Sequence, residues 1–238
     1  MKCFRVFLLY SLLFSIYPIY NYAQVTALRF ENFTTENGLP QNSGYSINQT
    51  AEGFMWFGTQ DGLCRFDGYR LKIYKHIQND SLSICGNQVN TLFTDYKGNM
   101  WIGTPNGVCI YLIHTDQFTS PAAYLGYDCE ADKLNTQFIM EGSDKNIWVV
   151  TANQGLYLLN THDKKTSRFF TENPDKLSLG EIKKDEQQRI CITNGNDIYR
   201  FNGVNFTSLQ IKNTTGFPLD DLTISHFLFT NKELWLAS

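Results

Sequence analysis

The sequence predicts an all-β protein, specifically a β-propeller of four-stranded antiparallel blades, incomplete, with about four blades plus the start of a fifth. The first observation is residues 56–68, which read as an apolar strand, a glycine-bearing turn and a second apolar strand. The second is that this segment recurs, with its first residue at positions 56, 101, 148, 190 and 235, which are 45, 47, 42 and 45 residues apart. A repeat of about 40 to 50 residues built from strands is typical of propeller blades. The third is composition, because 15% aromatic and only 18% charged residues favour a packed β domain over a disordered chain.

The elements are expected in the following order. Residues 28–34 alternate apolar and polar side chains and predict a lone strand, followed by a turn at 36–40. The strand segments of the five units are 45–47, 54–58, 63–66 and 69–74, then 89–93, 99–103 and 108–112, then 138–140, 148–151 and 154–160, then 189–193, 197–203 and 205–211, and finally 224–229 and 234–236. Residues 119–134 are the least regular part, and no helix of substantial length is expected in the mature chain.

The recurring residues predict how the units pack. Each buried tryptophan at 56, 101 and 148 would remove about 150–250 Å² from water, and its regular place on an interior strand favours core packing over sugar stacking. Gly58 and Gly103 would allow close approach of the neighbouring blade. The threonines that follow, at 59, 104, 151 and 193, are expected to hydrogen-bond into the next turn. In the third unit Lys145 stands where the first two units have a turn glycine, so that turn is less clearly indicated.

The N-terminus predicts export. Lys2 and Arg5 precede an apolar run of about a dozen residues, and Ala23 offers a small residue at a cleavage point. We therefore expect residues 1–23 to be a signal peptide and residues 24–238 to be the partial propeller. An uncleaved anchor is the alternative, although the run falls short of the roughly 18 residues of a spanning helix. A net charge of −3 and the lack of a basic run give no reason to expect a nucleic acid or an anionic membrane as partner.

The cysteines predict neither a disulfide framework nor a zinc site. Removal of Cys3 with the leader leaves an odd number, and no C-x-x-C occurs. The remaining cysteines are Cys64, Cys85, Cys109, Cys129 and Cys191. Cys64 and Cys109 share a repeat position with Tyr157 and Tyr199, which indicates core filling.

The repeat resembles a known family. The pattern Asp-x-x-Gly-x-x-Trp-Ile-Gly-Thr-x-x-Gly-Val around Trp101, together with the opening at residues 33–40, is similar to the two-component regulator propeller repeat. That repeat forms the periplasmic sensor of hybrid two-component proteins of Bacteroidota, and the resemblance covers residues 28–238. Copies three and four depart from it, with Val150 in place of glycine and Ile190 in place of tryptophan. In the family, two seven-bladed propellers precede a β-sandwich, a membrane helix and a histidine kinase.

The resemblance implies an extracytoplasmic sensor that recognises oligosaccharides from polysaccharide breakdown and regulates a membrane-linked histidine kinase. The expected location is the periplasm, with the full-length protein in the inner membrane, acting through self-association. The chain ends within its fifth unit, so we interpret it as an N-terminal fragment, and an open ring would expose sheet edges and be poorly soluble alone. The alternatives are a secreted propeller enzyme, such as a lyase or glycosidase, and a protein-binding scaffold.

No catalytic residue, metal ligand or cofactor is predicted, and the ligand-binding residues are unknown from the sequence. The catalytic and phosphate-binding motifs that would mark an enzyme do not occur. Tyr124 and Tyr127, in the irregular segment, are the better sugar-facing candidates, although rim packing is the more common role of such residues. His114 and His162 occupy equivalent turns of neighbouring blades and could share a metal, but turn histidines are usually solvated. His76 and His226 are isolated.

Overall fold

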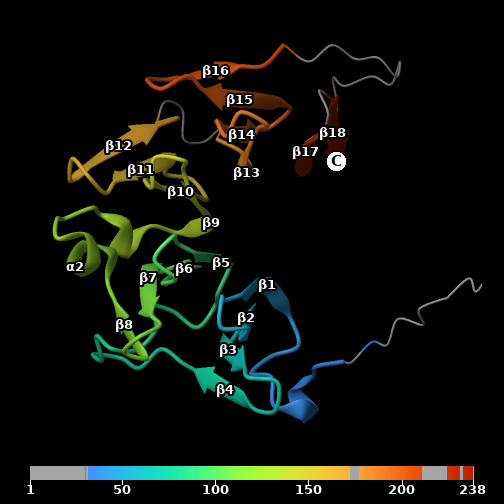
Figure 1. Cartoon of the computed structure of the whole chain (residues 1–238), viewed down its shortest axis with the longest axis vertical. Helices are drawn as coiled ribbons and strands as arrows, with labels where there is room; N and C mark the ends of the chain where they lie inside the picture. Colours follow the sequence, from blue (N-terminus) through green and yellow to red (C-terminus); the bar gives the residue numbers. More distant parts are fainter. Residues whose placement is uncertain (1–29, 31, 172–176, 211–223, 231–232, 238) are drawn as a thin grey trace, which may run out of the picture. The chain divides into compact units, whose positions relative to one another are not determined.

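The computed structural model describes residues 30, 32–171, 177–210, 224–230 and 233–237. The chain divides into two compact units, residues 1–32 and 33–238. The predicted signal peptide lies outside the described residues. All the strands reported below belong to the second unit, and Figure 1 shows their order along the chain.

Four sheets of four antiparallel strands follow one another, and a two-stranded sheet comes after them. The first sheet contains β1 (Gly44–Gln49), β2 (Met55–Thr59), β3 (Gly62–Phe66) and β4 (Leu71–Tyr74). The second contains β5 (Thr91–Thr94), β6 (Met100–Thr104), β7 (Gly107–Leu112) and β8 (Gln117–Thr119). The third contains β9 (Thr136–Glu141), β10 (Ile147–Thr151), β11 (Leu156–Asn160) and β12 (Lys165–Phe169). The fourth contains β13 (Leu179–Lys184), β14 (Ile190–Asn194), β15 (Asp197–Phe201) and β16 (Phe206–Ser208), and the fifth contains β17 (His226–Thr230) and β18 (Glu233–Ala237).

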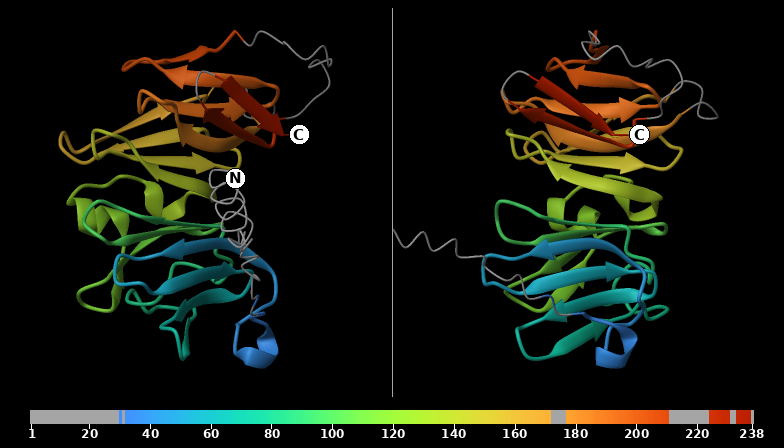
Figure 2. Two further views of the ribbon diagram at one scale, coloured as in Figure 1. Left: turned by 45° about the vertical axis from the view of Figure 1, so that its right-hand side comes forward. Right: turned by 90° about the vertical axis from the view of Figure 1, so that its right-hand side faces the viewer.

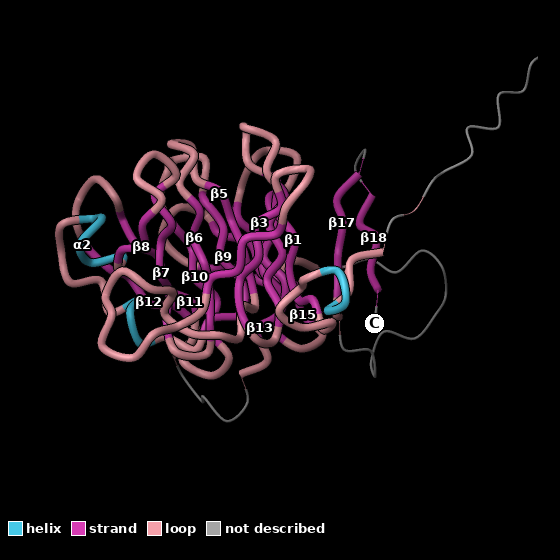
Figure 3. Tube along the Cα trace, turned by 90° about the horizontal axis from the view of Figure 1, so that it is seen from below, coloured by secondary structure: helices cyan, strands magenta, loops and turns pink. Residues whose placement is uncertain are grey.

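This arrangement confirms the predicted blades. Within every complete sheet each strand pairs with the next in sequence, as a meander does. The first strands β1, β5, β9, β13 and β17 contact one another in that order, and Figure 2 shows the successive sheets side by side in two views. Figure 3 shows that strands dominate the second unit, with short helices only at its periphery. Among the described residues, no helix has the length and apolar character needed to cross a membrane.

The core lies between neighbouring sheets, and the recurring tryptophans mark it. Trp56, Trp101 and Trp148 stand on the second strands of their sheets, fully buried in clusters shared with the following sheet. In the fourth sheet the register places Cys191 at the tryptophan position, buried in the cluster shared with the fifth sheet. The expectation that Ile190 stands there is wrong, because Ile190 faces the third sheet. These three tryptophans therefore serve as the stacking residues that the repeat predicts, whereas Trp235 in the fifth sheet is exposed.

The repeat glycines behave as predicted. A Cβ on Gly58 would stand 2.6 Å from the Val89 side chain, which precedes β5 of the next sheet. A Cβ on Gly103 would stand 2.6 Å from the Thr136 side chain on β9. Real Cβ contacts are not that short, so a larger residue would force the sheets apart. In the third sheet Val150 takes this position and is buried against residues of the fourth.

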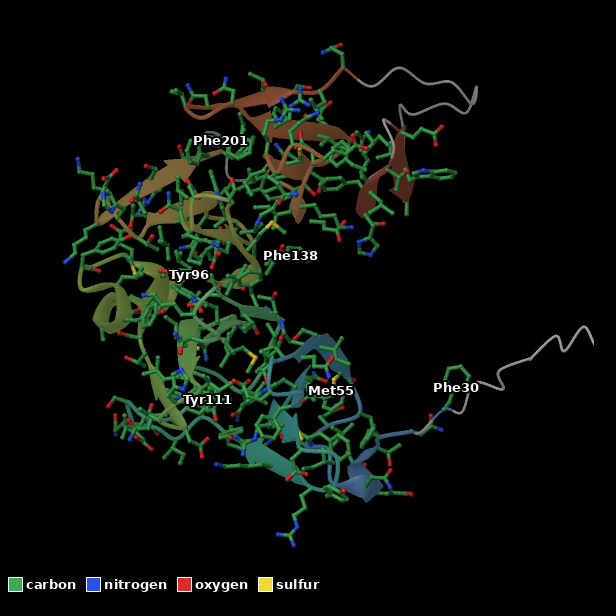
Figure 4. The ribbon with its side chains drawn as sticks, viewed as in Figure 1. Phe30, Met55, Tyr96, Tyr111, Phe138 and Phe201 are labelled. Carbon is green, nitrogen blue, oxygen red and sulfur yellow. The ribbon has the colours of Figure 1, made fainter. Side chains whose placement is uncertain are left out.

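Aromatic side chains extend these interfaces outward. Between the first and second sheets, Tyr111 stacks edge-on against Trp56 at 4.8 Å between ring centroids. Between the third and fourth, Phe201 meets Trp148 at 5.0 Å. Figure 4 labels Tyr111 and Phe201 at these two junctions. Aromatic pairs of this kind add about 0.5–1.5 kcal/mol each beyond the area they bury.

One expectation needs correction, and one that was less clearly indicated is confirmed. In the described part of residues 28–34 no strand forms, because the backbone N–H groups of Thr34 and Thr35 donate to the side chains of Asn37 and Asn42 rather than to a neighbouring strand. A single turn of 3-10 helix, η1 (Thr35–Asn37), stands where the turn was predicted. The turn at Lys145, by contrast, forms despite the missing glycine, and Lys145 itself adopts the left-handed conformation with φ of 65°.

Candidate ligand-binding site

A cavity of about 600 Å³ opens between the third sheet and the connection that leads to it from the second sheet. Residues from both sides line it: Ala122, Asp128, Glu130, Asp132, Lys133, Leu134, Gln154, Tyr157 and Arg168. The volume falls in the range of about 300–1,000 Å³ that small-molecule sites occupy. The first six residues belong to the segment that the sequence marked as irregular, and the last three belong to the hairpin and outer strands of the third sheet.

The irregular segment is held in place by short helices with defined ends. Helix α2 (Pro121–Leu125) begins after Ser120, whose side chain accepts a hydrogen bond from the Ala123 N–H, and it ends at Gly126 in the left-handed conformation. A 3-10 turn, η2 (Ala131–Lys133), follows, and its Ala131 is buried in the cluster that joins the second and third sheets. The sequence did not predict α2, because five residues are too few for a helical period to show. The segment thus forms a packed wall of the cavity.

Tyr157 is the residue that marks this cavity as a site. It lies on β11 with only 3% of its surface exposed, yet its hydroxyl finds no hydrogen-bond partner among the described residues. Burial raises the pKa of this hydroxyl, so it stays protonated and able to donate. The hydroxyl is not enclosed as a buried atom, because Tyr157 lines the open cavity. A ligand in the cavity could therefore accept a hydrogen bond from it.

Charged side chains surround the tyrosine. The Arg168 guanidinium lies over the Tyr157 ring, 5.0 Å from its centroid, and forms an ion pair with Glu130 across the cavity. Asp128 accepts a hydrogen bond from the Glu130 N–H at 3.2 Å. Burial raises the pKa of the Asp132 carboxyl, and the negative charge of Asp128 adds to the shift. The lining therefore combines carboxylate acceptors, a guanidinium donor and a free hydroxyl, a set suited to a neutral ligand with many hydroxyl groups.

A second cavity, of about 510 Å³, lies between the turns of the third and fourth sheets. Its arginines are already paired, because Arg189 and Arg200 approach the Asp185 carboxylate at 2.7 and 3.6 Å. Asn202 likewise accepts hydrogen bonds from backbone N–H groups of its own turn. The carboxylate that holds both arginines is buried, whereas the Arg168–Glu130 pair of the first cavity is exposed on both sides and more open to exchange with a ligand.

The two tyrosines singled out from the sequence pack at the rim. Tyr124 stands on α2 edge-on to Trp101, with 5.9 Å between ring centroids, and its hydroxyl donates to Asp95 at 3.2 Å. The Tyr127 hydroxyl donates to the Lys165 carbonyl at 3.2 Å. Both side chains contact the core cluster between the second and third sheets. They stabilise the irregular segment beside the cavity but do not line it.

The histidines remain separate. His114 and His162 lie exposed in the turns between the third and fourth strands of their sheets, which are the equivalent positions that the sequence indicated. His76 contacts the Ile84 carbonyl at 2.7 Å through Nδ1, and His226 lies 3.7 Å from Glu181. Within the described part of the chain, no three histidine, cysteine, aspartate or glutamate side chains gather as metal ligands would.

Sequence reasoning assigned Tyr157 to core filling and passed over Arg168 entirely. One signal was present: the repeat position occupied by Cys64 and Cys109 becomes tyrosine in the third and fourth sheets, which carries a hydroxyl into an apolar layer. Such a hydroxyl needs a polar neighbour or a cavity. Nothing in the repeat pattern pointed to Arg168, because its contacts come from a segment without a repeat.

Comparisons with known proteins agree with this architecture. A family profile described as "Two component regulator propeller" matches residues 83–106. A curated relative, histidine kinase P4 of Formosa agariphila, is 32% identical over 246 aligned residues that cover 63% of this chain and 18% of that protein. The chain therefore spans less than a fifth of the length of this curated relative.

Two solved structures are similar to this chain. The extracellular domain of the hybrid two-component system BT3049 from B. thetaiotaomicron is 21% identical with a TM-score of 0.48, covering 87% of this chain and 34% of that one. Virginiamycin B lyase from Staphylococcus aureus is 16% identical with a TM-score of 0.57, covering 82% of this chain and 62% of that one. At this identity the second likeness concerns the propeller architecture alone.

Proposed function

We propose that this chain, which carries two-component regulator propeller repeats, is the extracytoplasmic ligand-sensing propeller of a two-component signal transduction protein. The repeat matched at residues 83–106, set in a series of four-stranded sheets, is the observation that carries the proposal. The kinship with a histidine kinase supports it. Residues 1–23 would direct export, residues 24–238 would form the sensing unit in the periplasm, and the full-length protein would self-associate to regulate its membrane-linked kinase.

The ligand class we propose is an oligosaccharide released from a polysaccharide. Sugar hydroxyl groups both donate and accept hydrogen bonds. They would match the carboxylates of Asp128 and Asp132, the guanidinium of Arg168 and the hydroxyl of Tyr157 around the cavity. A sensor binds its ligand without converting it, so this function needs no catalytic group in the cavity.

The test uses the full-length protein and a panel of di- to octasaccharides, with melting temperature as the first measurement. A ligand present at about 100 times its Kd stabilises the folded state by about 2.7 kcal/mol, which raises the melting temperature by about 5–10 °C for a domain of this size. A ligand that gives this shift should also change the rate of kinase autophosphorylation. A sugar that is cleaved during incubation would instead support the alternative of a propeller enzyme.

Matched variants test the cavity separately. Tyr157→Phe removes only the hydroxyl, so we expect at least a tenfold loss of affinity with little change in the melting temperature of the unliganded protein. Tyr199→Phe, at the same repeat position of the fourth sheet, should bind normally. If no oligosaccharide shifts the melting temperature, the proposed ligand class is wrong. If one does so equally in the Tyr157→Phe protein, sensing stands and the site lies elsewhere.

A further inference from the structure

Two cysteines meet at the junction of the first and second sheets. Cys85 lies in the connection between β4 and β5, and Cys109 lies on β7. The Cys85 N–H donates to the Cys109 sulfur at 3.1 Å, and the Cys85 side chain is close enough to raise the pKa of the Cys109 thiol. The Cys85 sulfur also lies 3.5 Å from the Gly107 carbonyl oxygen and 3.7 Å from the Thr104 hydroxyl. Among the described residues, no other two cysteines are hydrogen-bonded to each other.

The two thiols differ in access. Cys85 is partly exposed, whereas Cys109 is 4% exposed and burial raises its pKa. Cys64, which holds the Cys109 position in the first sheet, is buried as well. In a pair made of a partly exposed cysteine and a buried one, the exposed cysteine can react with an external disulfide and the buried one can then displace the external group.

We propose that Cys85 and Cys109 form an oxidation site, which closes to an intramolecular disulfide when the protein meets a small or protein disulfide donor. The Cys85 thiolate attacks one sulfur of the donor, forming a mixed disulfide and releasing one donor thiolate. Cys109 then loses its proton and attacks the Cys85 sulfur, and the second donor thiol departs. Two electrons and two protons pass to the donor, which leaves as two thiols. The odd number of cysteines after removal of the leader is compatible with one disulfide, because Cys64, Cys129 and Cys191 stay buried as thiols.

The disulfide would tether the β4–β5 connection, which packs between the first and second sheets. That connection supplies the fully buried side chains Ile84 and Val89 to the cluster between these sheets. Its Gly86 lies so close to Thr104 that a Cβ there would stand 3.0 Å from the threonine hydroxyl oxygen. A disulfide from residue 85 to residue 109 closes a loop of about 25 residues, and closing such a loop restricts the unfolded chain without moving the packed connection.

The test is peptide mapping of the full-length protein exported to a bacterial periplasm, quenched in acid and alkylated after denaturation. Trypsin cleaves after Lys97, between the two cysteines, so the bond would appear as two cross-linked peptides. Fragmentation of the 98–133 peptide distinguishes Cys109 from Cys129, which lies on the same peptide. We expect this pair in the exported protein, together with alkylated Cys64, Cys129 and Cys191. The reduced protein treated with oxidised glutathione should form the same pair. Its melting temperature should rise by about 5–10 °C relative to the reduced protein.

Variants test the order of the steps. Cys109→Ser should retain glutathione on Cys85, because the second thiol is missing, whereas Cys85→Ser should stay unmodified. Cys64→Ser is the matched control and should leave the cross-link intact. Recovery of both Cys85 and Cys109 in alkylated form after glutathione treatment would overturn the proposal. So would a cross-link from Cys85 to Cys64. Both results are read from denatured protein, so they do not depend on the solubility of any variant.

Discussion

A single hydrogen-bonded threonine closes the central hairpin in three of the four complete sheets. The hydroxyls of Thr59 and Thr104 donate to the carbonyls of Gly62 and Gly107 at 2.8 and 2.9 Å. Thr151 does the same to Gly155 at 2.7 Å. All three glycines have positive φ, and a Cβ on Gly107 would also strike the Asp132 carbonyl beside the cavity. The threonine and the glycine therefore form one structural unit.

The fourth sheet lacks this unit. Asn194 and Asp197 form the pair that is threonine and glycine in the first two sheets. Thr193 lies one residue earlier, and its buried hydroxyl has no partner among the described residues. A positive φ costs aspartate more free energy than glycine, so the hairpin takes another form, in which Gly195 has a φ of 61°. The sequence predicted four equivalent threonines, and the prediction is confirmed for three and wrong for Thr193.

This difference makes a matched pair of variants. Thr104→Val should lower the free energy of unfolding by about 1–3 kcal/mol, because the Gly107 carbonyl loses its hydroxyl donor and the Asn106 N–H loses its acceptor. Thr193→Val should change it by no more than about 0.5 kcal/mol, because no hydrogen bond is lost there. Chemical denaturation followed by intrinsic fluorescence measures both. Equal losses in the two variants would show that the hydrogen bond is not what the threonine contributes.

At the scale of elements, a turn of the second sheet is hydrogen-bonded to the first sheet. Asp116, in the β7–β8 turn, accepts hydrogen bonds from Lys72 at 2.7 Å and Tyr74 at 3.0 Å, both on β4 of the first sheet. It also accepts from Tyr111 at 2.6 Å. Partial burial alone would raise its pKa, but the hydrogen bonds from Lys72, Tyr111 and Tyr74 lower the pKa of Asp116 to about 2. The ionised carboxylate is thus the form that holds the two sheets.

Acid should release this contact. Because the folded pKa lies below the usual 3.8, Asp116 contributes stability above about pH 4 and loses it as pH falls toward 2. Its side chain is 46% exposed, so solvent screening limits the contribution to no more than about 1 kcal/mol. Asp116→Asn should flatten the pH dependence of unfolding between pH 4 and pH 2. Asp163→Asn, in the corresponding turn of the third sheet, should leave it unchanged.

The same scale shows what the sequence could and could not predict. The strands could be predicted because the second and third strands of each sheet carry the repeated residues. The tryptophan near the start of the second strand shows which face of the sheet packs against the next sheet. The lone strand at 28–34 was wrong in its described part, since alternation cannot reveal that Asn37 and Asn42 take the backbone donors. The cavity was not predictable, because Glu130 and Arg168 lie 38 residues apart and only the folded chain pairs them.

At the scale of the whole second unit, the sheets differ in how their faces are covered. The second, third and fourth sheets bury apolar clusters on both sides. In contrast, β1 of the first sheet exposes Ile47, and the fifth sheet exposes Leu228 and Trp235, which are cross-strand neighbours. The exposed fractions of Ile47 and Trp235 are both 62%. Exposed apolar sheet faces of this kind commonly mark surfaces that associate with another sheet.

These faces predict how the 238-residue chain behaves when expressed alone. It should self-associate with rising concentration, and the double variant Ile47→Thr, Leu228→Thr should remain monomeric to at least a several-fold higher concentration. The melting temperature should stay within a few degrees, because exposed threonine keeps the β propensity of the strands and no buried area is lost. Val204→Thr removes a comparably exposed apolar group from the β15–β16 turn and should not affect association, because that residue lies off the sheet faces. Sedimentation velocity over a hundredfold concentration range distinguishes the cases. An unsubstituted chain that stays monomeric throughout would mean that these two faces do not drive association, whatever covers them in a longer protein.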